Sequence, residues 1–149
     1  MQKISAIIEA RSNSTRLPKK ILLKINNKTI IEYLVNNLKK SKIINEIIIA
    51  TTTNKEDDKI VKIAKKLKVN YFRGSEKNVL KRVIDASKFF KVKTIVRVTS
   101  DCPLIDVNLV DQYINIFKKN KFDIVGNAKV RSYPDGMDIE IINSQSLKK

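Results

Sequence analysis

The segment ARSNSTRLPKK, residues 10–20, concentrates hydrogen-bond donors directly after a short apolar run. Arg11, Arg16 and Lys20 carry positive charges, and Ser14 and Thr15 add hydroxyl groups between them. Arginine can bind phosphate oxygens in a bidentate manner, and lysine binds them as a point charge. The segment contains no glycine, and the chain has neither G-x-x-x-x-G-K-[ST] nor G-x-G-x-x-G. A loop of this kind would hold phosphate groups mainly with its side chains.

Asp101 supplies complementary chemistry, because it follows a second apolar run in the stretch VRVTSDCPLID. A carboxylate repels a phosphate group unless a divalent cation joins them, and Mg2+ commonly binds through one or two carboxylates plus substrate phosphates. The chain contains no histidine, which excludes histidine acid–base catalysis, Ser–His–Asp triads and histidine metal sites. Phosphoryl-type transfer depends mostly on positioning and charge neutralisation, so this chemistry survives the exclusion. The pattern predicts Asp101 as a ligand of Mg2+ in nucleotide chemistry.

An alternation of strands and helices must position these two segments. Apolar or alternating runs predict strands at residues 4–10, 46–52, 70–74, 94–100, 122–127 and 137–143. Amphipathic spacing predicts helices at residues 29–40, 55–68, 76–91 and 106–120. Thr29 and Glu32 form a capping-box pattern at the start of the first helix. The alternation implies a Rossmann-like α/β fold, with a mostly parallel sheet and helices on both faces.

The order of strands usual in such folds would place the first and fourth strands on either side of the ligand crevice. Ligands bind there at the carboxyl ends of the strands. The first strand leads into residues 10–20 and the fourth leads into Asp101. We therefore expect Arg16 and Asp101 to face one another across the same gap.

The basic composition, with a net charge of +16, raises the alternative of a non-enzymatic nucleic-acid-binding module. Only six of the 31 basic residues are arginine, and the lysines are scattered along helices, as in KIVKIAKKLK at residues 59–68. A scattered lysine excess is typical of a solvated surface. The sequence also offers few aromatic residues that could stack on bases. These features argue against nucleic acid as a partner.

The 149 residues suit one domain, and no apolar run approaches the ~20 residues that cross a bilayer. The first residues lack an apolar stretch of signal-peptide length, and a single cysteine, Cys102, fits a reducing compartment. We expect a cytoplasmic protein without membrane contact, with Cys102 as a small buried spacer. The final SQSLKK looks like a helix that has just begun. The chain is therefore expected to be the first part of a longer protein, truncated at its C-terminus.

Five motifs together resemble the sugar cytidylyltransferases, the group that contains the CMP-sialic acid and CMP-Kdo synthetases. They are IIEARSNSTRLPKKILL, IIIATTTNKEDDKI, YFRGSEKNVLKR, VRVTSDCPLIDVNLV and YPDGMDIE, in the order and at the spacing of the family. The similarity is closest to the branch of the spore coat polysaccharide biosynthesis protein SpsF and covers essentially the whole chain. It implies a GT-A-like nucleotidyltransferase fold in one domain. Residues 1–126 would be the nucleotide-binding part, and residues 127–149 the incomplete start of a sugar-binding part.

The resemblance implies an enzyme that transfers CMP from CTP to a sugar or sugar acid and releases pyrophosphate. Mg2+ would be its cofactor, cell-surface polysaccharide biosynthesis its role, and a homodimer a possible state of the full-length form. The choice of CTP over UTP or GTP rests on the resemblance alone. The residues leave the identity of the sugar open.

Carried over to this chain, the resemblance assigns roles to residues in four segments. The catalytic residues would be Arg16, Lys20 and Asp101, with Asp101 as the metal ligand. The nucleotide contacts would be Arg11, Ser14, Thr15, Arg73, Gly74, Ser75 and Arg97. Arg97 would support Asp101 from behind. The sugar contacts would be Asn127, Asp135, Asp138 and Glu140.

Three departures from the family pattern bear on this assignment. Glycine is usual where this chain has Asn13 and Lys19, and losing glycine narrows the available backbone conformations. The second metal-binding aspartate of the family lies beyond residue 149. A site with one aspartate would hold Mg2+ more weakly, so an inactive piece of the transferase is a second alternative.

Structural roles compete with the functional ones at several positions. Arg11 and Arg16 could pair with Glu9 or with helix carbonyl groups, and Asp101 could cap a helix. Asp138 and Glu140 alternate along a predicted strand and could be its solvated face. Acidic residues in the first turn of the second helix are expected to interact with the helix dipole; these are Glu56, Asp57 and Asp58.

Overall fold

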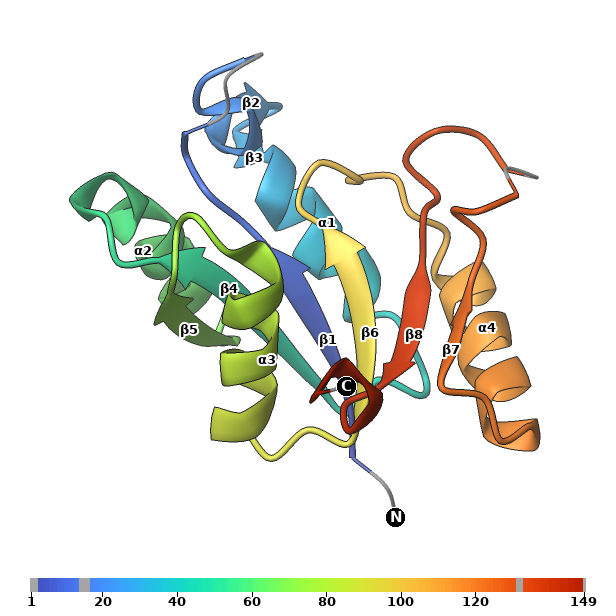
Figure 1. Ribbon diagram of the computed structural model, residues 1–149. Helices are drawn as coiled ribbons and strands as arrows, with labels where there is room; N and C mark the ends of the chain where they lie inside the picture. The colour runs from blue at the N-terminus through green and yellow to red at the C-terminus, as the bar shows by residue number, and fades with distance from the viewer. Residues whose placement is uncertain (1–2, 14–16, 131–132, 149) are drawn as a thin grey trace.

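A six-stranded sheet forms the centre of the molecule, in the order β5-β4-β1-β6-β8-β7 (Figure 1). The computed structural model describes residues 3–13, 17–130 and 133–148. The sheet strands are β1 (Ile4–Glu9), β4 (Glu46–Thr52), β5 (Asn70–Gly74), β6 (Thr94–Thr99), β7 (Ile124–Gly126) and β8 (Glu140–Asn143). The helices are α1 (Ile30–Leu38), α2 (Asp58–Lys66), α3 (Val79–Phe89) and α4 (Val107–Lys119). The expected alternation of strands and helices is present.

Four neighbouring strands, β5, β4, β1 and β6, run parallel, which confirms the predicted Rossmann-like, mostly parallel sheet. β8 lies antiparallel between β6 and β7, a position that the sequence pattern did not predict. The described residues between β7 and β8, 127–130 and 133–139, include no helix, and the two strands pair antiparallel, as strands joined without a helical crossover do.

Helices cover both faces of the sheet, as predicted (Figure 1). α1, α2 and α4 pack on one face through residues that include Ile31, Ile60 and Ile114. α3 packs on the opposite face through Val83 and Ala86, beside the short 3₁₀ helix η3 (Ser146–Lys148). Strands covered on both faces are apolar along their whole length, which explains the nearly continuous apolar run of β4. Within the described ranges, no helix is both long and apolar enough to cross a membrane.

A small hairpin precedes α1 and was not predicted. Its strands are β2 (Lys24–Ile25) and β3 (Lys28–Thr29), and they follow the 3₁₀ helix η1 (Lys20–Leu22). Asn26 and Asn27 between the strands have φ angles of 46° and 64°. Asparagine tolerates this left-handed region better than most residues, and two such residues in a row suit the tight turn of a two-residue hairpin. The dipeptide Asn-Asn was the available signal.

The predicted capping box at the start of α1 is confirmed, and it makes Glu32 a buried ionised group. The backbone N–H of Thr29 donates to Glu32 Oε2 at 2.6 Å, and Lys66 Nζ lies 2.8 Å from Oε1. The Glu32 side chain is 7% exposed. Burial by itself would raise its pKa, but the hydrogen bonds from Lys66 and Thr29 lower the pKa of Glu32 from 4.5 to about 2.

This ionised Glu32 gives a prediction for acid stability. A folded-state pKa below the unfolded value means that the stabilisation is complete above about pH 5 and is lost as pH falls towards about 2. We expect Glu32→Gln to lower the free energy of unfolding at neutral pH by about 2 kcal/mol and to flatten its decline in that acid range. Urea unfolding at a series of pH values measures both effects. Glu56→Gln, at an exposed position on η2 (Lys55–Asp57), is the control. Equal acid slopes in the two variants would contradict the prediction.

Candidate functional site

The carboxyl ends of β1 and β6 lie side by side, as the strand pattern predicted. Glu9, the last residue of β1, pairs with Thr99, the last residue of β6. The backbone N–H of Ser100 then donates to the carbonyl of Glu9 at 3.2 Å. The loop that begins at Ala10 and the loop that carries Asp101 therefore leave the sheet at the same edge, which is where ligands bind in folds of this kind.

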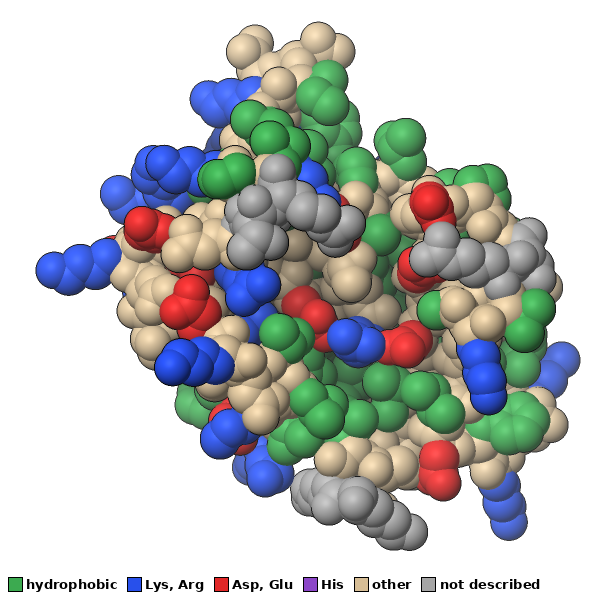
Figure 2. Space-filling view, turned by 45° about the horizontal axis from the view of Figure 1, so that its top comes forward, with side chains coloured by type: hydrophobic (Ala, Val, Ile, Leu, Met, Phe, Trp, Pro, Cys, Tyr) green, Lys and Arg blue, Asp and Glu red, His purple; other side chains and the backbone are tan. Residues whose placement is uncertain are grey.

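A cavity of about 280 Å³ opens between these two loops. Its lining residues come from the ends of β1 and β6, the start of η1 and the first turn of α3. They are Glu9, Ala10, Arg11, Lys20, Ile21, Val79, Arg82, Thr99, Ser100 and Asp101. Figure 2 looks onto this end of the sheet, and basic and acidic side chains lie close together around the hollow in its middle. A larger hollow of about 480 Å³ lies at the opposite ends of β1, β4 and β5, and none of the predicted site residues lines it.

Lys20 and Asp101 form an ion pair across the cavity, with Lys20 Nζ 2.7 Å from Asp101 Oδ2. The hydrogen bond from Lys20 lowers the pKa of Asp101, while partial burial acts in the opposite direction. The two side chains are 34% and 42% exposed, so the pair itself contributes at most about 1 kcal/mol to stability. A ligand can break an ion pair this weak. Lys20 would then be able to bind a phosphate group, and Asp101 a divalent cation.

The backbone at Lys19 suits the glycine that the family resemblance implied at this position. Lys19 has a φ of 59° and precedes η1 in a left-handed conformation. This left-handed conformation costs a non-glycine residue roughly 1–2 kcal/mol of conformational free energy that glycine does not lose. Asn13 has no positive φ, so glycine is not required at that position in this conformation. The departure from the family pattern at Asn13 is therefore mild, whereas the departure at Lys19 places a strained backbone next to Lys20.

The start of the basic loop is held by Asp57, which sequence reasoning assigned to the helix dipole. Asp57 is 2% exposed, and its Oδ1 accepts the backbone N–H of Ser12 at 2.7 Å. Its Oδ2 accepts a hydrogen bond from the hydroxyl of Thr52 at the end of β4. Asp57 is therefore a buried anchor for the loop, because η2 turns its side chain inward towards β1. Arg11, the residue before Ser12, is exposed and lines the cavity.

Three predicted residues of the basic loop, Ser14, Thr15 and Arg16, lie outside the described residues. Their roles as phosphate contacts and, for Arg16, in catalysis stay predictions. The described parts of the loop on either side of them, Arg11 and Lys20, both reach the cavity.

Three of the predicted nucleotide contacts, Arg73, Gly74 and Ser75, lie at the end of β5 and directly after it. Arg73 donates to the carbonyls of Thr52 at 2.8 Å and Asn54 at 2.7 Å, and it lies 2.6 Å from Asp58 Oδ1. Gly74 has no room for a side chain, since a Cβ there would lie 2.9 Å from a ring carbon of Phe72. Ser75 accepts the backbone N–H of Asn78 at 3.1 Å. These contacts order the end of β5 and the segment after it, none of the three residues lines the cavity, and their predicted nucleotide contacts stay predictions.

Arg97 joins three neighbouring strands, and its predicted roles as a nucleotide contact and as a support for Asp101 stay predictions. Its Nε donates to Glu9 on β1 and its Nη1 donates to Glu140 on β8. The hydrogen bond to Glu9, ahead of the opposing effect of burial, raises the pKa of Arg97. Glu140, predicted to contact a sugar, is therefore an ion-pair partner of Arg97. Glu9, the other partner of Arg97, also lines the cavity.

The other predicted sugar contacts lie before β8, close to the loop that carries Asp101. Asn127 is buried and fastens this segment, because it donates to the carbonyl of Met137 at 2.8 Å and accepts the N–H of Ile139 at 2.8 Å. The sulfur of Met137 accepts the backbone N–H of Asp106 at 3.3 Å. Asp138 is partly buried and Asp135 is exposed. The predicted sugar and metal segments are neighbours, and the sugar contacts stay predictions.

Cys102 and Arg82 are two further buried side chains at this end of the sheet. Cys102 is 5% exposed and burial raises the pKa of its thiol, which agrees with the predicted role as a buried spacer. Arg82 on α3 lines the cavity although it is 1% exposed, and sequence reasoning did not select it. Its only distinguishing signal was that it is the one arginine inside a predicted helix.

Comparisons with known proteins show which proteins this chain resembles. The chain matches the family described as cytidylyltransferase over residues 5–149. It is 44% identical over 147 residues to the protein MJ1063 of Methanocaldococcus jannaschii, which covers 99% of this chain and 59% of that protein. It is 31% identical over 151 residues to the spore coat polysaccharide biosynthesis protein SpsF of Bacillus subtilis, covering 99% of this chain and 62% of that protein.

A solved structure shows the same fold. A cytidylyltransferase from Leptospira borgpetersenii serovar Hardjo-bovis has a TM-score of 0.96 and 39% sequence identity to this chain, with 99% of this chain and 63% of that one covered. The chain thus spans about three fifths of the length of these relatives. The resemblance carried by the five sequence motifs is confirmed, and the chain belongs to the sugar cytidylyltransferase family.

Proposed function

We propose that this chain forms the nucleotide-binding part of an enzyme that transfers CMP from CTP to a sugar or sugar acid and releases pyrophosphate. The observation that carries the proposal is the contact of Lys20 with Asp101 across the cavity between β1 and β6. These are the phosphate-binding and metal-binding side chains that the family resemblance assigned. The product would be a CMP-sugar for cell-surface polysaccharides, made by a cytoplasmic protein that could be a homodimer in its full-length form.

The described side chains divide the work of binding and charge neutralisation. Arg11 and Lys20 would hold the triphosphate, together with Arg16 from the part of the loop outside the described residues. Asp101 would hold Mg2+, and a single carboxylate suits Mg2+ when phosphate oxygens supply further ligands. When bound, Mg2+ would neutralise charge on the phosphates. In the transfer, a hydroxyl oxygen of the acceptor would bond to the α-phosphorus and lose its proton to water, while the bond from the α-phosphorus to the bridging oxygen breaks and its electron pair leaves with pyrophosphate.

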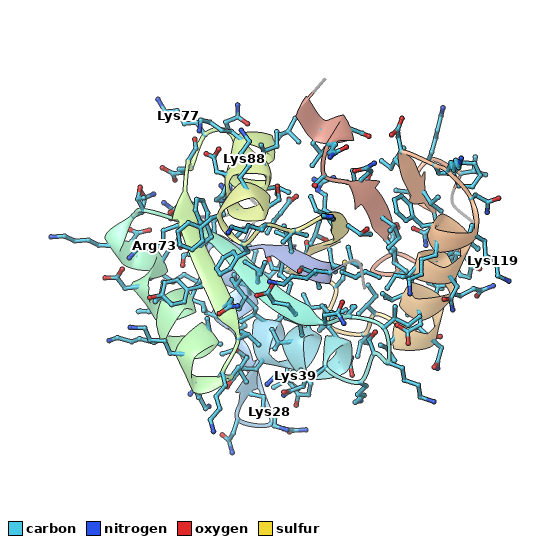
Figure 3. The ribbon with its side chains drawn as sticks, turned by 90° about the horizontal axis from the view of Figure 1, so that it is seen from below. Lys28, Lys39, Arg73, Lys77, Lys88 and Lys119 are labelled. Atoms are coloured by element: carbon cyan, nitrogen blue, oxygen red, sulfur yellow. The ribbon has the colours of Figure 1, made fainter. Side chains whose placement is uncertain are left out.

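The basic surface does not favour the alternative of a nucleic-acid-binding module. Figure 3 shows Lys28 on β3, Lys88 on α3 and Lys119 on α4 on different sides of the molecule. Nucleic acid binding needs cations gathered along one face or groove. The scattered lysines are consistent with a solvated surface.

A thermal shift series against CTP, UTP, GTP and ATP with Mg2+ tests the proposal. A ligand at 100 times its dissociation constant stabilises the folded state by about 2.7 kcal/mol, which corresponds to a rise in Tm of roughly 5–10 °C for a chain of this size. We expect this rise with CTP and a smaller one with the other three nucleotides. Absence of a shift with every nucleotide would contradict the proposal. A larger shift with UTP or GTP than with CTP would show that the protein prefers a base other than cytosine.

A further inference from the structure

Arg82 is a buried arginine whose hydrogen-bond partners are neutral. It lies on α3, is 1% exposed and ranks among the largest fully buried side chains of the molecule. Its Nε donates to the carbonyl of Ala50 on β4 at 3.3 Å, and its Nη1 donates to the carbonyl of Ser75. Gly74 leaves room for it, since a Cβ there would lie 3.2 Å from Arg82 Cγ. These hydrogen bonds place the guanidinium between β4 and the residue that follows β5.

The positive charge of Arg82 has no carboxylate beside it. Among the described residues, no Asp or Glu oxygen lies within 4.0 Å of its nitrogens. Glu9, Asp57 and Glu76 attract it from farther away, and of these Glu9 is bonded to Arg97 and Asp57 to Ser12. Burial lowers the pKa of Arg82, and the like charge of Arg11 acts in the same direction. A buried charge with no counter-ion in direct contact is unfavourable in the unliganded protein, so an anion that brings an opposite charge closer would bind favourably.

The position of this charge identifies where that anion would lie. Arg82 lines the same cavity as Arg11 and Lys20, so three cationic side chains reach one cavity from the loop after β1, from η1 and from α3. The same lining carries two carboxylates, and among the described residues Asp101 pairs with Lys20 and Glu9 pairs with Arg97. The low-dielectric walls of a cleft strengthen the electrostatic attraction between the cations and a bound anion.

We propose that Arg82 is a positioning residue for a polyphosphate ligand, which it stabilises through its buried charge at the cavity while it donates a hydrogen bond to the Ser75 carbonyl. This inference rests on the proposed function, because it assigns part of nucleotide affinity to a residue outside the basic loop. It names the ligand class as a polyphosphate anion and predicts that a neutral nucleoside gains nothing from Arg82.

Two variants separate the charge of Arg82 from its hydrogen bonds. Arg82→Gln keeps an N–H donor for the Ser75 carbonyl and removes the charge, whereas Arg82→Lys keeps the charge. Lys88→Gln removes one charge from an exposed position of the same helix and is the matched control (Figure 3). Calorimetry then measures the affinities for CTP, inorganic pyrophosphate and cytidine, and urea unfolding measures stability without ligand.

We expect Arg82→Gln to weaken CTP and pyrophosphate binding at least ~10-fold, as for a lost interaction with a charged group. The cytidine affinity of Arg82→Gln should stay unchanged. The CTP and pyrophosphate affinities of Arg82→Lys and Lys88→Gln should stay within about 3-fold of the wild type. Without ligand, Arg82→Gln should be no less stable than the wild type, because it removes an uncompensated buried charge. Unchanged pyrophosphate affinity in Arg82→Gln overturns the inference. So does an equal loss for cytidine, or an Arg82→Gln chain that is destabilised or unfolded, since each indicates a purely structural residue.

The same measurements separate this inference from the proposed function. If the wild type binds pyrophosphate in an Arg82-dependent manner but does not prefer CTP, the cytidylyl function fails and the anion site stands. If the wild type binds CTP and Arg82→Gln binds it equally well, the function stands and the role of Arg82 fails.

Discussion

Replacing Asp101 with asparagine in the natural protein is expected to lower the rate of CTP-dependent pyrophosphate release at least ~100-fold, the size of effect seen when a charge-stabilising group is removed. Asparagine keeps the shape of the side chain but loses the charge that would hold Mg2+. It also leaves Lys20 without its partner at 2.7 Å, so the empty cavity becomes more positive. CTP affinity without metal should therefore be retained or increased while turnover falls. A pyrophosphate-release assay and a calorimetric titration measure the two quantities.

The control for this variant is Asp106→Asn, five residues along the same loop. Asp106 is exposed and caps α4 by accepting the N–H of Asn108 at 2.8 Å. Asparagine caps helices as well as aspartate does, so this variant should keep both stability and activity. Wild-type turnover in Asp101→Asn, or an equal loss in Asp106→Asn, would remove Asp101 from the proposed site.

The second large effect is expected on stability. We predict that Asp57→Ala lowers the free energy of unfolding by about 3 kcal/mol, because hydrogen bonds to a charged group contribute about 1.5–3 kcal/mol and the buried N–H of Ser12 would lose its acceptor. Burial by itself would raise the pKa of Asp57, but hydrogen bonds from Thr52 and Ser12 lower it below its ordinary 3.8. The stabilisation is therefore present above about pH 4 and is lost as pH falls through the folded-state pKa. Urea unfolding at neutral and acid pH measures the loss.

The neighbouring Asp58→Ala is the matched control for Asp57. Asp58 is 52% exposed in its ion pair with Arg73, so its removal should cost at most about 1 kcal/mol. Asp57→Ala should also weaken CTP binding, because Ser12 anchors the loop on which Arg11 lies. Equal destabilisation by the two variants would show that Asp57 has no special anchoring role.

Much of the fold follows from the local pattern of the sequence. The apolar run of β4, the stripe on α2 and the Thr29–Glu32 capping box each depend on residues close together in the chain, and each was predicted correctly. Two features of the fold were missed. The Asn26–Asn27 turn formed a hairpin too short for a periodic pattern, and the position of β8 depended on pairing with β6, which is distant in sequence.

The sequence by itself determined the family, the parallel core of the sheet and the meeting of the basic loop with the Asp101 loop. These follow because strand and helix periods, and the order of four strand–helix units, restrict the possible topologies to very few. Only the tertiary structure decided what individual charges do. Asp57 became a buried anchor, Arg97 a link between Glu9 and Glu140, and Arg82 a buried cation under the cavity. The physical reason is that burial and counter-ions, which set the behaviour of a charged group, come from residues far away in the chain.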